Sequence, residues 1–260
     1  MTNDKTVSFH NLKVFLQQVD DTYLRKDGLE YLSDEEIRLM FVRPANEVKD
    51  ETTLKEKITR GGQIDIMSNM NLAEASGRED RIIFYKDSTV NFHDSEISIS
   101  ANASSAEPNK NWSALYVEEG ANVVFEGNEG GIKYQGNAPA GQDGPYCITN
   151  FGGTITIKSG NYHALGTCVY GYAGTTIIEG GYFEATKSTP DTRPVKTWTL
   201  NLLNTAYQDG TAKMIVRGGT FVDFDPSNPG TDDASSYVDE GYKVVSEAAD
   251  GHTLYSVVKE

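Results

Sequence analysis

The feature that most constrains the fold is a doubled stretch: residues 146–164 and residues 167–185 match position by position at an offset of 21 residues. The first copy is YCITNFGGTITIKSGNYHA and the second is TCVYGYAGTTIIEGGYFEA. The aligned pairs are, among others, Cys147 with Cys168, Ile157 with Ile178, Gly160 with Gly181 and Ala164 with Ala185. A register kept without a gap indicates repeated structural units that stack on one another.

The same pattern recurs along most of the chain as a motif of apolar, any, apolar and polar residues, followed by a turn of small residues. Its five copies are Val90–His93, Val123–Glu126, Ile155–Lys158, Thr176–Glu179 and Met214–Arg217, spaced by 33, 32, 21 and 38 residues. Ten residues before the second apolar position lie Ile82, Leu115, Cys147 and Cys168. Five residues after it lie Ile97, Tyr162, Phe183 and Phe221, with Ile132 taking this role in the second copy.

Apolar positions that recur in each copy, while the polar position drifts, are typical of a β-solenoid. Each coil there stacks its inward side chains on the same position of the next coil. We therefore predict a mainly β protein built on a right-handed parallel β-helix of about five coils, ~24 Å long at the strand spacing. A β-sandwich would instead give antiparallel hairpins with no constant register. The longer spacings predict insertions at one corner, over residues 101–111, 137–145 and 186–197.

Three regions follow from the change in periodicity. Residues 1–62 are predicted to be helical, residues 63–240 to form the β-helix, and residues 241–260 to close it with a hairpin around Asp250-Gly251. A stripe with heptad-like spacing marks the first helix, and its members are Phe9, Leu12, Leu16, Val19 and Tyr23. This stripe is either an oligomerisation and attachment seam or a face packed on the chain's own second helix. A third helical piece is expected from Thr52 to about Ile58.

Composition excludes some partners. The net charge of −15 and the pI of about 4.7 leave no basic stripe for nucleic acid, and an anionic membrane would repel the chain. No stretch approaches the length of a membrane span, and the N-terminal residues show no apolar signal core. We therefore expect synthesis in a cytosol, without a Sec-type signal and without membrane insertion.

Few residues suggest chemistry, and we expect neither a cofactor nor a bound metal. Cys147 and Cys168 share one stacked core position and are interpreted as buried thiols, with a disulfide or a metal pair as the alternative. Glu126 and Glu179 are two coils apart, a spacing that glycoside hydrolysis tolerates, but Lys158 between them favours a ladder of alternating charges. The acidic turn around Asp223 is interpreted as solvated instead of calcium-binding, and the four histidines have no partner fixed by spacing.

Aromatic residues are the remaining candidates for binding. Five tyrosines fall near positions expected to point outward, namely Tyr116, Tyr134, Tyr170, Tyr172 and Tyr182. Exposed tyrosine on a regular β surface offers rigid apolar area with a polar tip, which suits contact with sugars or proteins. The alternative is that several of them line the core or the corners.

Two stretches carry a resemblance to a family. VSFHNLKVFLQQVDDTYLRKDG…YLSDEEIRLMF resembles the N-terminal region of virion structural proteins from tailed (crAss-like) phages of gut bacteria. GGTFVDFDPSNPG…YVDEGYKVVSE…HTLYSVV resembles the last coil and hairpin of their β-helix proteins. The resemblance implies a non-enzymatic head-fibre, tail-fibre or decoration protein, often a homotrimer, displayed on the virion. It is expected to contact other virion proteins through its N-terminal module, and bacterial surface glycan. A glycan depolymerase and a capsid cement protein are the alternatives.

Overall fold

The computed structural model describes residues 46–106, 110–137, 144–186, 198–230 and 234–260. The chain divides into two compact units, Met1–Asn46 and Glu47–Glu260. The division falls after Asn46, whereas the sequence predicted a boundary after residue 62, so Glu47–Gly62 belongs to the unit that carries the sheets. The predicted attachment stripe lies outside the described residues; its members are Phe9, Leu12, Leu16, Val19 and Tyr23.

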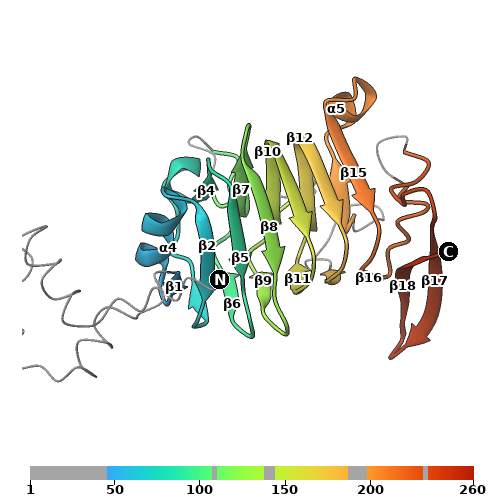
Figure 1. The fold of residues 1–260 in the computed structure, drawn as a ribbon, viewed down its shortest axis with the longest axis horizontal. Coiled ribbons are helices and arrows are strands. Elements are labelled where there is room, and N and C mark those ends of the chain that lie inside the picture. The colour runs from blue at the N-terminus through green and yellow to red at the C-terminus, as the bar shows by residue number, and fades with distance from the viewer. Residues whose placement is uncertain (1–45, 107–109, 138–143, 187–197, 231–233) are drawn as a thin grey trace, which may run out of the picture. The chain divides into compact units, whose positions relative to one another are not determined.

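Two sheets build the second unit, and the larger one contains two series of parallel strands (Figure 1). The first series consists of β4 (Ile82–Phe84), β7 (Ser113–Glu118), the first half of β10 (Tyr146–Ile157), the first half of β12 (Thr167–Ile178) and β14 (Leu200–Leu202). The second series consists of β1 (Glu47–Val48), β2 (Gly62–Ile66), β5 (Ser88–Asn91), β8 (Asn122–Glu126), the second halves of β10 and β12, and β15 (Ala212–Val216).

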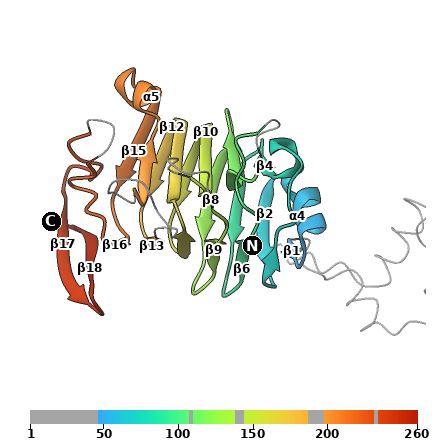
Figure 2. The ribbon, with the colours of Figure 1, turned by 180° about the vertical axis from the view of Figure 1, so that it is seen from behind.

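The other sheet forms the third series, seen from behind in Figure 2. Its parallel strands are β3 (Met70–Asn71), β6 (Glu96–Ile99), β9 (Gly131–Tyr134), β11 (Asn161–Ala164), β13 (Tyr182–Ala185) and β16 (Thr220–Val222). A hairpin of β17 (Tyr242–Ala249) and β18 (His252–Lys259) ends the chain, and β18 pairs antiparallel with β16. From β7 to β16 the chain passes through the three series in a constant order.

The strand register confirms the repeat. Ile157 pairs with Ile178 and Ala164 with Ala185, as the doubled stretch predicts. One row joins the predicted equivalent positions of the third series: Ile97, Ile132, Tyr162, Phe183 and Phe221.

Two predicted equivalences are wrong. In the first copy, Val90 pairs with Phe125 and not with Val123, so this copy is displaced by two residues. Leu115 pairs with Ile148 and not with Cys147, a displacement of one residue.

The core lies between the three series. Tyr162, Phe183 and Phe221 are fully buried and stack with ring centroids 5.0 Å apart at both contacts. Gly160 and Gly181 precede two of these strands with φ of 103° and 105°, a backbone region that favours glycine. The turn of small residues in the motif thus follows from the backbone that leads into the third series.

Helices are few among the described residues. Helix α4 (Glu51–Ile58) confirms the predicted third helical piece, and the Asp50 carboxylate caps it by accepting from the Thr53 amide at 2.8 Å. It packs against β1, β2 and β4 and buries Leu54 and Ile58. The others are η1 (Arg78–Asp80) and α5 (Asn204–Gln208). In the described part of the chain, no helix has the length and apolar content needed to cross a membrane.

Candidate ligand-binding groove

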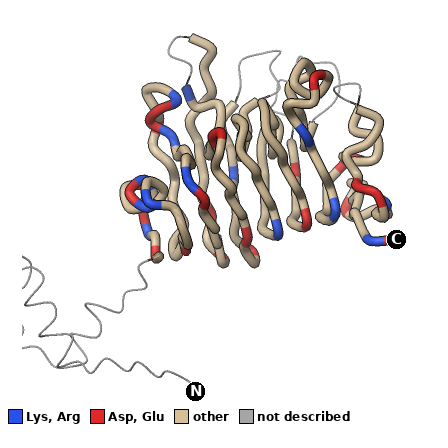
Figure 3. The backbone as a smooth tube through the Cα atoms, turned by 45° about the horizontal axis from the view of Figure 1, so that its top comes forward, with Lys and Arg blue, Asp and Glu red and all other residues tan. Residues whose placement is uncertain are grey.

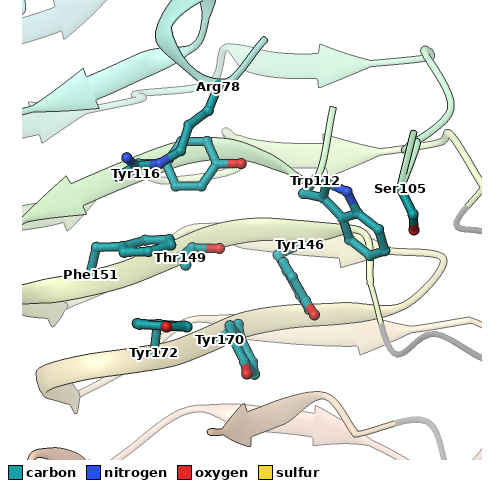
Figure 4. A pocket seen from close by; sticks show the side chains of 9 residues that line it. All are labelled: Arg78, Ser105, Trp112, Tyr116, Tyr146, Thr149, Phe151, Tyr170 and Tyr172. Carbon is teal, nitrogen blue, oxygen red and sulfur yellow. The ribbon is translucent and has the colours of Figure 1, made fainter. Parts of the chain in front are cut away.

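An aromatic groove of about 420 Å³ lies over β7, β10 and β12, on the face of the first series that points away from the core (Figure 4). Its lining residues are Arg78, Ser105, Trp112, Tyr116, Tyr146, Thr149, Phe151, Tyr170 and Tyr172. Six of these nine side chains are aromatic, and only that of Arg78 carries a charge.

Strand alternation explains the central row of the lining, but not Tyr146, because the two residues that follow it, Cys147 and Ile148, both lie in the core. Leu115, Ile148 and Val169 pair across the strands and are buried in the core. The next residue of each strand points to the opposite face, since side chains alternate along a strand. Parallel pairing in register therefore aligns Tyr116, Thr149 and Tyr170 in one outward row.

The rings form two stacks across neighbouring strands. Tyr146 and Tyr170 stack with centroids 4.6 Å apart and planes within 11°, and Trp112 lies 6.3 Å from Tyr146. Phe151 and Tyr172 stack at 4.6 Å and 16°, and Tyr116 lies 5.8 Å from Phe151. Figure 4 shows Thr149 between the two stacks. Such stacks hold rings rigidly, so a ligand meets a preformed surface.

Arg78 extends the second stack. Its guanidinium carbon lies 4.2 Å from the Phe151 ring centroid and 4.9 Å from that of Tyr116. The same guanidinium forms an ion pair through Nη2 with Oε1 of Glu118, the last residue of β7. Burial is the main cause that raises the pKa of Tyr116 to about 12, so its hydroxyl stays protonated and can donate a hydrogen bond.

The floor of the groove holds polar groups with unused hydrogen-bonding capacity. Thr149 is only 2% exposed, and its hydroxyl has no hydrogen-bond partner among the described residues. Nε of Arg78 is also buried without an acceptor in this part of the chain. By contrast, the Trp112 indole donates to the Ser104 carbonyl at 2.8 Å, which fixes this ring in place. Buried polar groups normally have partners, so a ligand that supplies them would bind favourably here.

The structure brings together three of the five predicted tyrosines: Tyr116, Tyr170 and Tyr172 line the groove. The prediction that Tyr134 points outward is wrong. This residue is 1% exposed, and its hydroxyl donates to the backbone carbonyls of Ala101 and Asn111. Tyr182 lies on β13 in the other sheet, 5.8 Å from His163 and outside the groove.

The sequence reasoning missed six of the nine lining residues: Arg78, Ser105, Trp112, Tyr146, Thr149 and Phe151. The doubled stretch contained a signal for three of them, because Tyr146, Thr149 and Phe151 sit on β10, which pairs with the strand that carries Tyr170 and Tyr172. No comparable signal marked Arg78, which reaches the groove from η1, outside the repeat.

The cysteines agree with the interpretation as core residues. Both are free and fully buried. Cys147 Sγ donates to the His163 carbonyl at 3.1 Å, and Cys168 Sγ donates to the Tyr162 carbonyl at 3.2 Å. Burial raises the pKa of Cys168 well above its usual value, which keeps this thiol neutral and unreactive.

The carboxylates considered for catalysis, Glu126 and Glu179, and the acidic turn considered for calcium do not line the groove. Lys158 Nζ is 3.9 Å from Glu126 Oε2, which agrees with the predicted ladder of alternating charges. Asp223 accepts from His252 Nδ1 at 2.7 Å and from the Thr253 amide at 2.8 Å, so its oxygens serve the C-terminal hairpin. Among the described residues, no group of three or more His, Cys, Asp or Glu side chains could hold a metal ion.

Charges of both signs occur along the described unit, with Lys and Arg interspersed among Asp and Glu (Figure 3). The fold and the groove together define a mainly β protein with stacked parallel strands and an aromatic groove on one outer face. The chain matches no protein-family model, and no significant similarity links it to a curated protein or to a solved structure.

Proposed function

We propose that this chain is a non-enzymatic virion structural protein, a fibre-like or decoration protein that contacts glycan on the host surface through its aromatic groove. The single observation that carries glycan contact is the groove itself, with two ring stacks around a buried hydroxyl that has no partner in the described part of the chain. Sugars present apolar C–H faces beside hydroxyls, and rigid aromatic rings next to unused hydrogen-bonding groups complement both.

The proposed architecture is a right-handed parallel β-helix of about five coils with a hairpin at its C-terminal end. Its support is the constant order in which the chain visits three series of parallel strands. A right-handed path is the usual solution for parallel strands joined by crossovers in one sheet. The antiparallel hairpin would then cover an edge that otherwise leaves backbone groups unpaired.

The virion part of the proposal depends on the resemblance of the N-terminal and C-terminal stretches to phage structural proteins. In this proposal the N-terminal unit, Met1–Asn46, attaches the chain to other virion proteins, and the chain assembles as a homotrimer. A rigid β scaffold then displays the groove in several copies, and simultaneous contacts strengthen weak binding to a surface.

Binding without cleavage is the testable core of the proposal. Full-length protein would be run through gels containing purified surface polysaccharides of gut bacteria, and the same mixtures would be assayed for new reducing ends. We expect retarded migration and no reducing ends. Release of reducing ends would identify a depolymerase instead, and unretarded migration with every polysaccharide would refute glycan contact.

Attachment to the particle needs a separate measurement. Mass spectrometry and cryo-EM of particles from a phage that encodes this chain should find it on the outer surface with the groove exposed. A groove buried against neighbouring capsid subunits would support the cement alternative and would contradict a display role.

A further inference from the structure

We infer that the groove selects uncharged glycans, and that Glu118 enforces this selection by neutralising Arg78. This inference rests on the proposed glycan contact and adds to it a ligand class and a specificity-determining residue. Three observations carry it: the Arg78–Glu118 pair, the charge of the remaining lining residues, and the polar groups that lack partners.

The pair neutralises the positive charge that Arg78 would otherwise offer to an acidic sugar. Arg78 Nη2 contacts Glu118 Oε1, and the two side chains are 37% and 19% exposed. The guanidinium is also held over the rings of Phe151 and Tyr116, so it cannot swing freely toward a new anion. A ligand carboxylate would have to displace Glu118 or lie beside it, and a displaced, partly buried carboxylate is unfavourable.

The uncharged state of the other lining residues and the net charge of the whole chain also disfavour an acidic ligand. Apart from Arg78, none of the nine lining side chains is ionised at neutral pH. The whole chain carries a net charge of −15, which lowers the local concentration of any anionic ligand at low ionic strength. Among the described residues, no charge at the groove surface therefore offsets the desolvation of an acidic sugar.

An uncharged sugar, in contrast, meets complementary groups. A ligand hydroxyl can accept from Arg78 Nε and exchange a hydrogen bond with Thr149 Oγ1, both of which are buried without partners among the described residues. Its C–H face can contact Tyr172, which is 45% exposed at the open side of the second stack. A hydroxyl accepts from a guanidinium without bringing a second charge against Glu118.

The test compares matched oligosaccharides that differ only in a uronic acid in place of a neutral hexose, measured by titration calorimetry. For the wild-type protein we expect at least tenfold tighter binding of the neutral form, with an affinity that does not change with salt. In Glu118→Gln the freed guanidinium should improve binding of the acidic form about tenfold, since charge-assisted hydrogen bonds to arginine are of that strength. Binding of the neutral form should change less than about threefold.

Further variants separate the outcomes. The double variant Arg78→Gln, Glu118→Gln should lose the gain for acidic sugars, and this excludes a general loosening of the groove. Tyr172→Ala should weaken neutral binding about tenfold, whereas Tyr85→Ala, at a more exposed tyrosine outside the groove, should not.

Two sets of results would contradict the inference, one of them the selection alone and the other glycan contact as well. Wild-type preference for acidic sugars, or an unchanged ratio in Glu118→Gln, would overturn the selection while leaving glycan contact intact. Failure of every glycan to bind, or binding of a proline-rich peptide that Tyr172→Ala abolishes, would overturn glycan contact and the selection with it.

Discussion

Phe183 offers the sharpest test of the stacked core. This residue of β13 is fully buried, and it is the middle ring of a three-ring stack. Tyr162 lies on one side and Phe221 on the other, each with its centroid 5.0 Å away and its plane within 11°. The Phe183→Ala substitution therefore removes two ring contacts at once and leaves a cavity bounded by strands on both sides.

The expected cost follows from these contacts. Truncation of a buried phenylalanine to alanine lowers the free energy of unfolding by about 3–5 kcal/mol, through lost burial and the remaining cavity. Each stacked pair adds about 0.5–1.5 kcal/mol beyond burial, so the middle ring belongs near the upper end, at about 5 kcal/mol. Phe183→Leu keeps most of the volume but loses both ring contacts, and we expect a loss of about 1–3 kcal/mol.

Urea denaturation followed by circular dichroism measures both losses, provided that the unfolding slope stays equal among the variants. Tyr182→Ala is the matched control, because its side chain is the preceding one on the same strand and points to the other face. We expect less than about 1 kcal/mol there. A loss below about 2 kcal/mol for Phe183→Ala, or equal losses for Phe183→Ala and Tyr182→Ala, would refute the stacked arrangement.

Three other perturbations follow from the structure and the sequence. Asp223 raises the pKa of His252, and His252 lowers the pKa of Asp223. Their hydrogen bond should therefore stabilise the hairpin most at a pH between these two pKa values. NMR titration should give a His252 pKa above 6.5, which falls toward 6.5 in Asp223→Asn. Gly131→Ala would place its Cβ against a backbone carbonyl of β11, and should cost about 3 kcal/mol in urea denaturation. The double substitution Leu12→Asp, Leu16→Asp should reduce the proposed trimer to monomers in sedimentation analysis.

Each of these three predictions has a result that would contradict it. The sign of the pH effect follows from the shifts: the bond weakens as pH rises through the raised histidine pKa, and again as pH falls through the lowered aspartate pKa. A hairpin whose amide exchange is equally protected across both limits would contradict this. For Gly131 the control is Gly251→Ala, where a Cβ meets open space but φ is 84°, and the loss should be near 1 kcal/mol. An unchanged trimer in the leucine variant would exclude the stripe as the seam.

The sequence predicted the third series well because its signal is local. Each strand follows a turn of small residues, its aligned residue lies five residues after the apolar motif, or seven in the second copy, and the row from Ile97 to Phe221 aligned without error. The turn needs glycine for its backbone at Gly160 and Gly181, so composition and geometry point to the same position. Agreement of this kind is what makes a repeat visible in a single sequence.

The displaced first copy shows what such a pattern leaves undetermined. Side chains alternate with a period of two, so a shift of two residues keeps every apolar side chain on the core face. Both Val90 and Phe92 are buried, and either could have been the partner of Phe125. The register here is decided by contacts across the core, where Phe92 stacks on Phe125 at 6.1 Å and meets Tyr162 edge-on. No local pattern contains that information.

The alternation of side chains along a strand could have predicted the burial of Tyr134. Ile132 belongs to the inward row of β9, and the residue two positions later faces the same side. Alternation alone therefore places Tyr134 in the core, where burial raises its pKa and its hydroxyl meets backbone carbonyls. Tyr116 is also nearly buried, at 4% exposed, yet it lines the groove because Arg78 covers it. Exposure alone does not identify a binding residue.

The position of the groove follows from which connections between strands are long. Connections from the first series to the second and from the second to the third are short in the central repeats, whereas long ones lead from β6 into β7, from β9 into β10 and from β13 into β14. The off-strand lining residues come from such connections: Arg78 precedes β4, and Ser105 and Trp112 precede β7.

Only the ends of these connections must keep register, so their residues can change without disturbing the stacked core. The strands supply the fixed aromatic rows and the connections supply the residues that surround them. A groove built in this way can alter its specificity through residues such as Arg78 while the strands of the repeat stay constant. The doubled stretch therefore determines the scaffold and two rows of the groove, and under the proposed function the connections determine which ligand fits between them.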